Sequence, residues 1–203
     1  MKIAIDGPAA AGKGTLTKIL AKEIGATTLN TGKLYRVVAF SIQGKNTEEE
    51  AVENSGKFLQ FLEKHGNNPE IYSQKNSQLT SQISAIPQVR ANLLHFQREF
   101  AGLHNPVILE GRDIGTHILP NADFKFYLTA SPEARAKRRY EQEVQSGVES
   151  NFEHILQAVI KRDEQDENRK ENPLIPAKDA IIVNTTNYTI AESLRIMLQH
   201  IKG

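Results

Sequence analysis

The segment that most constrains the fold of this chain is GPAAAGKGT, residues 7–15, which directly follows the apolar run Ile3-Ala4-Ile5. Its spacing matches G-x-x-x-x-G-K. This order predicts a strand, a tight loop and a helix, in which backbone N–H groups of the loop and the helix N-terminus converge on phosphate oxygens. The alternative is a glycine-rich turn that binds nothing. The predicted nucleotide-binding residues are Gly7, Pro8, Ala9, Ala10, Ala11, Gly12, Lys13, Gly14 and Thr15.

A direct magnesium ligand is missing from its usual place in this motif. Gly14 stands where a serine or threonine normally follows the lysine, so residue 14 offers no hydroxyl to the ion. Thr15 comes next, and we expect it to contact the ion through water or to contact phosphate. We therefore predict no direct protein ligand for Mg²⁺ in this loop.

The composition is that of an ordinary globular α/β domain. The 203 residues are 39% hydrophobic and 24% charged, with a net charge of +1 and no cysteine. The absence of cysteine excludes disulfides and thiolate metal sites, and the small net charge argues against nucleic acid as a partner. The apolar run at the N-terminus is too short for a signal peptide, and no segment approaches the ~20 apolar residues of a membrane helix. We expect a cytoplasmic protein with no membrane partner.

Hydrophobic patterning predicts strands that alternate with helices, and hence an α/β fold with a five-stranded parallel sheet flanked by helices. The expected strands are 3–6, 107–109, 124–128 and 180–183, with 71–72 as a further candidate. The expected helices are 13–23, 31–40, 47–64, 87–100, one that starts at 131–133, 152–168 and 190–201. Ligands should gather at the carboxyl ends of the strands.

Arginines form a second pattern. Arg162, Asp166 and Arg169 are spaced i, i+4, i+7 and share one helix face. Arg112 and Asp113 follow an expected strand, and further arginines stand at 36, 135, 138 and 139. Phosphoryl transfer needs such an array, because guanidinium groups stabilise the charge that its transition state spreads over several oxygens. The alternative is a salt-bridged surface on which Arg162, Asp166 and Arg169 pair with one another.

Five segments together resemble the bacterial cytidylate kinases. They are IAIDGPAAAGKGT, NTGKLYR, SQISAIPQVR, EGRDIGT and KRDEQDENR, and they spread from residue 3 to residue 169. The resemblance implies a P-loop kinase that transfers the γ-phosphate of ATP to CMP or dCMP in pyrimidine nucleotide metabolism. It also implies Mg²⁺, a monomer, and a single domain over 1–203. The core would be 1–42, 86–138 and 153–203, with a nucleoside-monophosphate-binding insertion at 43–85 and a small lid at 139–152.

The same resemblance implies a role for each matching residue. The cytosine edge would be read by Ser81, Arg90 and Asp113, and Tyr35 would pack beside the base or its phosphate. The CMP phosphate would be held by Arg36, Arg112 and Arg169. The ribose hydroxyls would meet Asp166 and Arg162, and Thr31 would lie near the acceptor. The lid arginines would be Arg135 and Arg139, with Arg138 as a further candidate. The catalytic set would be Lys13, Arg112, Arg135, Arg139 and Arg169.

The chain departs from this family in three places. Asn30 stands where the family is often acidic, and Glu110 stands where aspartate is common, as a candidate for water-mediated contact with Mg²⁺. The 43–85 insertion is shorter than the family pattern with its small three-stranded sheet, of which only EIYSQKNSQLTSQ remains. Two alternatives stay open: a P-loop kinase of another small acceptor such as AMP, UMP or shikimate, and a nucleotide-binding regulatory module without turnover.

Overall fold

The computed structural model describes residues 1–45, 47–147 and 149–202, which form two compact units. The first unit comprises Met1–Thr28 and His104–Gly203, and the second comprises Leu29–Leu103. Residues 46, 148 and 203, which belong to the predicted insertion, lid and core in turn, lie outside the described residues.

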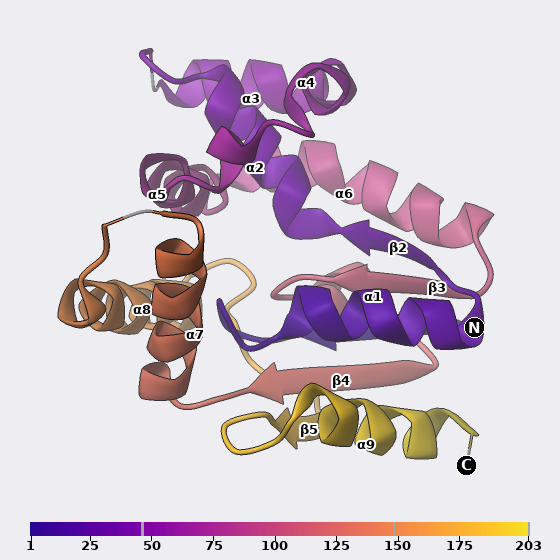
Figure 1. The fold of residues 1–203 in the computed structure, drawn as a ribbon. Coiled ribbons are helices and arrows are strands. Elements are labelled where there is room, and N and C mark those ends of the chain that lie inside the picture. The colour runs from indigo at the N-terminus through magenta and orange to yellow at the C-terminus, as the bar shows by residue number, and fades with distance from the viewer. Residues whose placement is uncertain (46, 148, 203) are drawn as a thin grey trace. The chain divides into compact units, whose positions relative to one another are not determined.

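The central element is a five-stranded sheet with the strand order β2-β3-β1-β4-β5 (Figure 1). Its strands are β1 (Lys2–Asp6), β2 (Thr27–Asn30), β3 (Val107–Glu110), β4 (Phe124–Thr129) and β5 (Ile181–Asn184). β1 pairs in parallel with β3 and β4, and β4 pairs in parallel with β5. This confirms the predicted five-stranded parallel sheet. Asp6, Glu110 and Thr129 therefore end their strands at one edge, where the loop of residues 7–15 begins.

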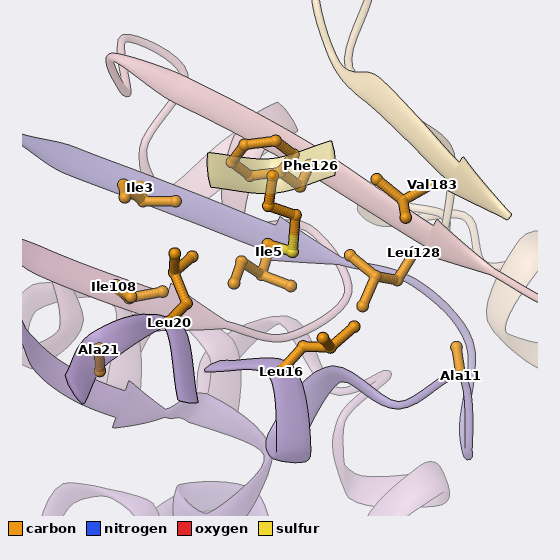
Figure 2. Packing of buried hydrophobic residues seen from close by; sticks show 11 residues of the cluster. Ile3, Ile5, Ala11, Leu16, Leu20, Ala21, Ile108, Phe126, Leu128 and Val183 are labelled. Atoms are coloured by element: carbon orange, nitrogen blue, oxygen red, sulfur yellow. The ribbon is translucent and has the colours of Figure 1, made fainter. Parts of the chain in front are cut away.

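Two helices of the first unit pack on this sheet, and two more pack on each other beyond its carboxyl edge (Figure 1). They are α1 (Lys13–Ile24), α7 (Pro132–Gln145), α8 (Phe152–Glu167) and α9 (Ile190–Lys202), with a short helical turn at Ile114–Ile118. Side chains of α1 and α9 meet the sheet in one apolar cluster (Figure 2). Ile3, Ile5 and Leu20 are fully buried there, which fixes β1 and α1 on either side of the loop that joins them.

The second unit is helical. Its elements are α2 (Thr31–Ser41), α3 (Glu48–Gly56), α4 (Phe58–His65), a 3-10 helix (Pro69–Tyr72), α5 (Gln74–Ile83) and α6 (Pro87–Leu103). Leu34, Val38, Ile71 and Leu93 are buried, and the rings of Phe58 and Phe96 meet with centroids 4.9 Å apart.

Two local predictions were wrong, and one strand was missed. The single helix expected over 47–64 is two helices that meet at Lys57. The strand candidate 71–72 lies in the 3-10 helix, because Asn68 caps that turn by accepting a hydrogen bond from Glu70 N at 2.9 Å and Pro69 occupies its first position. The fifth strand is instead β2, which the sequence patterning did not single out.

The second unit is wider than the predicted insertion, because α2 and α6 belong to it. The division of the chain into core, insertion and lid stays a prediction. Over the described parts of the chain, no helix combines the length and apolar character that crossing a membrane requires.

Candidate active site

At two positions the loop between β1 and α1 has a backbone conformation that residues other than glycine rarely adopt. Gly7 has φ 143° and Gly12 has φ 93°. A Cβ on Gly7 would lie 2.0 Å from the Leu128 carbonyl oxygen. The loop therefore packs directly against the end of β4, which explains the glycine at the first motif position.

The carbonyl groups of residues 7–11 each accept a hydrogen bond from a side chain. Lys13 Nζ donates to the first two, at 2.7 Å each. Arg135 Nη1 and Arg138 Nη1 donate to the next two, at 3.4 and 3.5 Å. Thr185 Oγ1 donates to the fifth at 3.1 Å. Because C=O and N–H point in opposite directions across a trans peptide, this arrangement leaves the N–H side of the loop for an anion.

Charges behind the loop are arranged around Lys13. Burial lowers the pKa of Lys13, and the Arg112 charge acts in the same direction. Burial raises the pKa of Glu110, whereas the Lys13 charge opposes that rise. Glu110 ends β3 and faces the first turn of α1, where a Cβ on Gly14 would lie 3.6 Å from Glu110 Oε1. The positive charge of Lys13 and the negative charge of Glu110 therefore stabilise each other at the start of α1.

The donor set here fits a magnesium ion that is bound mainly by its nucleotide. Among the described residues, no group of three or more histidine, cysteine, aspartate or glutamate side chains could hold a metal. The candidates near the loop are the buried carboxylate of Glu110 at the end of β3 and the exposed Thr15. Mg²⁺ commonly takes one or two carboxylates together with phosphates and waters. The absence of a direct ligand from the loop stays a prediction.

An arginine cluster surrounds Asp166 on α8, whose side chain is 0% exposed. Arg112 Nε donates to Asp166 Oδ2 at 2.8 Å, and Arg162 Nε donates to Oδ1 at 3.1 Å. Arg169 Nη2 also donates to Oδ1. Burial alone would raise the pKa of Asp166, but the three guanidinium charges hold it well below its usual range.

The mutual pairing of Arg162, Asp166 and Arg169, kept open as an alternative, is present. It does not form an isolated surface face, because Arg112 joins it from the segment after β3. Arg112 Nη1 also donates to the Gly7 carbonyl at 3.0 Å. The cluster is therefore tied to the phosphate-binding loop itself.

The three arginines of α7 point to different partners. Arg135 is 2% exposed, and its Nη1 donates to Asp163 Oδ1 of α8 at 2.9 Å, while Nη2 donates to Oδ2 of the same carboxylate. Arg138 donates to both Thr185 Oγ1 and the Thr185 carbonyl. Arg139 instead donates to Glu143 Oε1 at 3.2 Å, within α7. Arg135 and Arg138 thus belong to the loop's surroundings, whereas Arg139 lies along its own helix.

Asp6 at the end of β1 fixes the turn after Asp113. Its two carboxylate oxygens accept from Ile114 N and Gly115 N, at 2.8 and 2.7 Å. Burial raises the pKa of Asp6 to about 6, although both backbone hydrogen bonds lower it. The helical turn that begins at Ile114 is thereby anchored, and so is the segment that carries Arg112 and Asp113.

The second unit gathers the other predicted acceptor residues. Arg90 lies over the Tyr35 ring, 5.9 Å from its centroid. Arg36 Nη1 donates to Ser77 Oγ at 2.8 Å and its guanidinium lies over the Tyr72 ring. The N-terminus of α2 is capped by Asn30, whose Oδ1 accepts from Lys33 N at 3.0 Å. Asparagine and aspartate are equally good N-caps, so the amide at this position keeps the cap.

The predicted site residues thus fall into two groups. The first unit holds the loop residues 7–15, Glu110, Arg112, Asp113, Arg135, Arg138, Arg139, Arg162, Asp166 and Arg169. The second unit holds Thr31, Tyr35, Arg36, Ser81 and Arg90. Sequence reasoning missed Asp6, Asp163 and Thr185. Asp163 was visible only as the acid of the KRD triplet, and Thr185 carried no signal beyond its place after the last strand.

Comparison with known proteins identifies the family. A family model for cytidylate kinase matches residues 3–203. The chain belongs to the cytidylate kinase family. It is 39% identical to a cytidylate kinase of Shewanella loihica, over 98% of this chain and 94% of the relative. It is 41% identical to a cytidylate kinase of Caldanaerobacter subterraneus subsp. tengcongensis, over 100% of this chain and 95% of the relative.

A solved structure supports the fold of this family member. The shikimate kinase from Bacteroides thetaiotaomicron has a TM-score of 0.52 and 15% sequence identity, and the match covers 100% of this chain and 99% of that one. At this identity the likeness concerns the fold alone. It agrees with the predicted P-loop kinase fold.

Proposed function

We propose that this member of the cytidylate kinase family transfers the γ-phosphate of ATP to CMP or dCMP, giving ADP and CDP or dCDP. The observation that carries the proposal is the position of Arg112. Its guanidinium is held by Asp166 and donates to the Gly7 carbonyl at 3.0 Å. A cationic cluster that is fixed to the phosphate-binding loop suits a reaction between two phosphate-bearing substrates.

The donor side of the reaction is assigned to the loop and Lys13. The loop N–H groups would bind the phosphates of ATP, and Lys13 would bring its charge to the β- and γ-phosphates. Without nucleotide, the Lys13 ammonium is held next to the loop by the Gly7 and Pro8 carbonyls. Glu110 and Thr15 would contact Mg²⁺ through water, and the ion would neutralise charge on the phosphates when bound.

The acceptor side is assigned to the remaining predicted residues. Arg36, Arg112 and Arg169 would bind the CMP phosphate, and Asp166 with Arg162 would contact the ribose hydroxyls. Ser81, Arg90 and Asp113 offer a hydroxyl, a forked donor and a carboxylate, which suit the O2, N3 and exocyclic amine of cytosine. Arg135 and Arg139 would stabilise the transferring phosphoryl group. Positioning and electrostatic stabilisation supply most of the acceleration in such a reaction.

An acceptor panel tests this function. ADP release from ATP and Mg²⁺ is measured with CMP, dCMP, UMP, AMP and shikimate, each against a blank without acceptor. We expect turnover above the blank chiefly with CMP and dCMP. Turnover with another acceptor alone would still show a kinase, but it would refute the assignment of Ser81, Arg90 and Asp113 to cytosine. ATP binding without turnover on any acceptor would favour the regulatory module.

The base-reading assignment has a separate test. The double change Ser81→Ala with Asp113→Ala removes two of the three proposed contacts with cytosine, each of which should contribute on the order of 1–3 kcal/mol. Discrimination between CMP and UMP should fall while the KM for ATP stays within about twofold. An unchanged ratio of the two rates would refute the assignment.

The resemblance also supports a monomeric, cytoplasmic enzyme whose partners are its small-molecule substrates rather than nucleic acid or membrane. Light scattering at assay concentration tests the monomer.

A further inference from the structure

Helix α8 presents two carboxylates three residues apart, and each holds an arginine that also donates to the phosphate-binding loop. Asp166 holds Arg112, which donates to the Gly7 carbonyl. Asp163 holds Arg135, which donates to the Ala9 carbonyl. Residues at i and i+3 lie on one face of a helix, so one surface of α8 aligns two cations with one loop.

The bidentate ion pair between Asp163 and Arg135 is well shielded from water. The Arg135 side chain is 3% exposed and that of Asp163 is 16% exposed. Both carboxylate oxygens accept from different nitrogens of the guanidinium. A bidentate arginine–carboxylate pair fixes direction as well as distance, and screening by solvent is weak at this burial.

Further contacts leave Arg135 with one defined orientation. Its Nε donates to the Ala130 carbonyl at 2.9 Å, directly after β4. Within the part of the chain that the structure describes, the second N–H of Nη2 has no hydrogen-bond partner. The guanidinium is thus fixed on its other sides and keeps one donor.

We propose that Asp163 is a positioning residue, which orients the Arg135 guanidinium at the phosphate-binding loop for the transferring phosphoryl group. This inference rests on the proposed kinase function. Asp163 acts only through Arg135 and touches no substrate. Without the carboxylate, Arg135 would keep its charge but lose the contact that sets its direction, so that transition-state stabilisation would fall more than substrate binding.

The first test compares Asp163→Asn with the wild-type chain under saturating substrates. We expect kcat to fall by about tenfold or more, with the KM for CMP within about twofold. Asp163→Glu, which keeps the charge, should recover part of kcat. The matched control is Asp179→Asn, which removes a carboxylate from another ion pair, with Lys125 Nζ at 2.8 Å, before the start of β5. The control should keep wild-type kcat.

A double-mutant cycle separates positioning from a purely structural role. Arg135→Lys should lower kcat, and adding Asp163→Asn should lower it little further, because the carboxylate acts through that arginine. A lower Tm for Asp163→Asn with unchanged kcat would overturn the proposal, as would a rise in kcat or fully additive effects of the two changes.

The assay also distinguishes this inference from the proposed function. If the wild-type chain phosphorylates CMP and Asp163→Asn matches it, only the role of Asp163 fails. If the wild-type chain does not phosphorylate CMP, the proposed function fails, and the cycle is repeated on whichever acceptor the panel identifies. If no acceptor is phosphorylated, Asp163 has no phosphoryl transfer to assist and the inference falls as well.

Discussion

Replacing Asp166 by asparagine is the sharpest test of the arginine cluster, because it removes one charge and changes almost no volume. The carboxylate is fully buried and accepts from Arg112 at 2.8 Å, from Arg162 at 3.1 Å and from Arg169. Hydrogen bonds to charged groups contribute about 1.5–3 kcal/mol each. The amide keeps one acceptor oxygen, but its NH₂ group would face a guanidinium.

The expected loss is therefore close to that of breaking a buried ion pair, about 3–5 kcal/mol in the free energy of unfolding. For a chain of this length, that corresponds to a drop in Tm of roughly 6–20 °C. Urea unfolding and calorimetry of Asp166→Asn measure it, with Glu53→Gln as the control at the exposed ion pair with Lys57, where the loss should stay within about 1 kcal/mol. A loss below about 1 kcal/mol for Asp166→Asn would refute the reasoning that the cluster needs this charge.

Three further changes test the loop and its support. Lys13→Met removes the donor to the Gly7 and Pro8 carbonyls, and kcat should fall about 10²–10³-fold in the ADP-release assay; a fall of less than tenfold would contradict the role. Gly7→Ala would put a Cβ 2.0 Å from Leu128 O, so urea unfolding should show a loss of about 3 kcal/mol, whereas Gly25→Ala, with no heavy atom within 4 Å of the new Cβ, should lose less. The pKa of Asp6 is raised from 3.8 to about 6, so the stability it contributes is complete below pH 3.8 and is lost as the pH rises through 6. The unfolding free energy of the wild-type chain minus that of Asp6→Asn should therefore fall by roughly 2.5 kcal/mol between pH 4 and pH 7, and a flat difference would show that the buried carboxylate is not protonated.

The sheet and the phosphate-binding loop could be predicted because their signals are local. The motif at 7–15 fixes the order of strand, loop and helix, and the continuous burial of β1 agrees with its unbroken apolar run. The second unit was harder to predict, because short polar helices such as α5, with the sequence QKNSQLTSQI, contain few apolar residues. N-capping residues mark where these helices begin: Ser73 accepts a hydrogen bond from Asn76 N, and Thr47 accepts one from Glu50 N.

The arginine array was predictable as a set but not in its pairings. The spacing of Arg162, Asp166 and Arg169 follows from helix geometry, whereas the contact of Arg112 with Asp166 spans 54 positions and depends on how the segment after β3 meets α8. Asp163 looked like one acid in a charged run, and only the fold shows that it is paired with Arg135. Long-range ion pairs of this kind leave no periodic trace in a sequence.

The side chains around the loop explain why three consecutive alanines suffice at residues 9–11. Each carbonyl of the loop has its partner elsewhere in the fold: in Lys13, in the arginines of α7 and in Thr185 after β5. The side chains of the loop therefore need only be small, because its backbone is held by hydrogen bonds from these cationic side chains and from Thr185. Arg112, which follows β3, and Arg135 of α7 are themselves fixed by carboxylates of α8. A change on α8 that never touches a substrate should therefore reach the phosphate-binding loop through one intervening guanidinium, and this is the coupling that the Asp163 cycle measures.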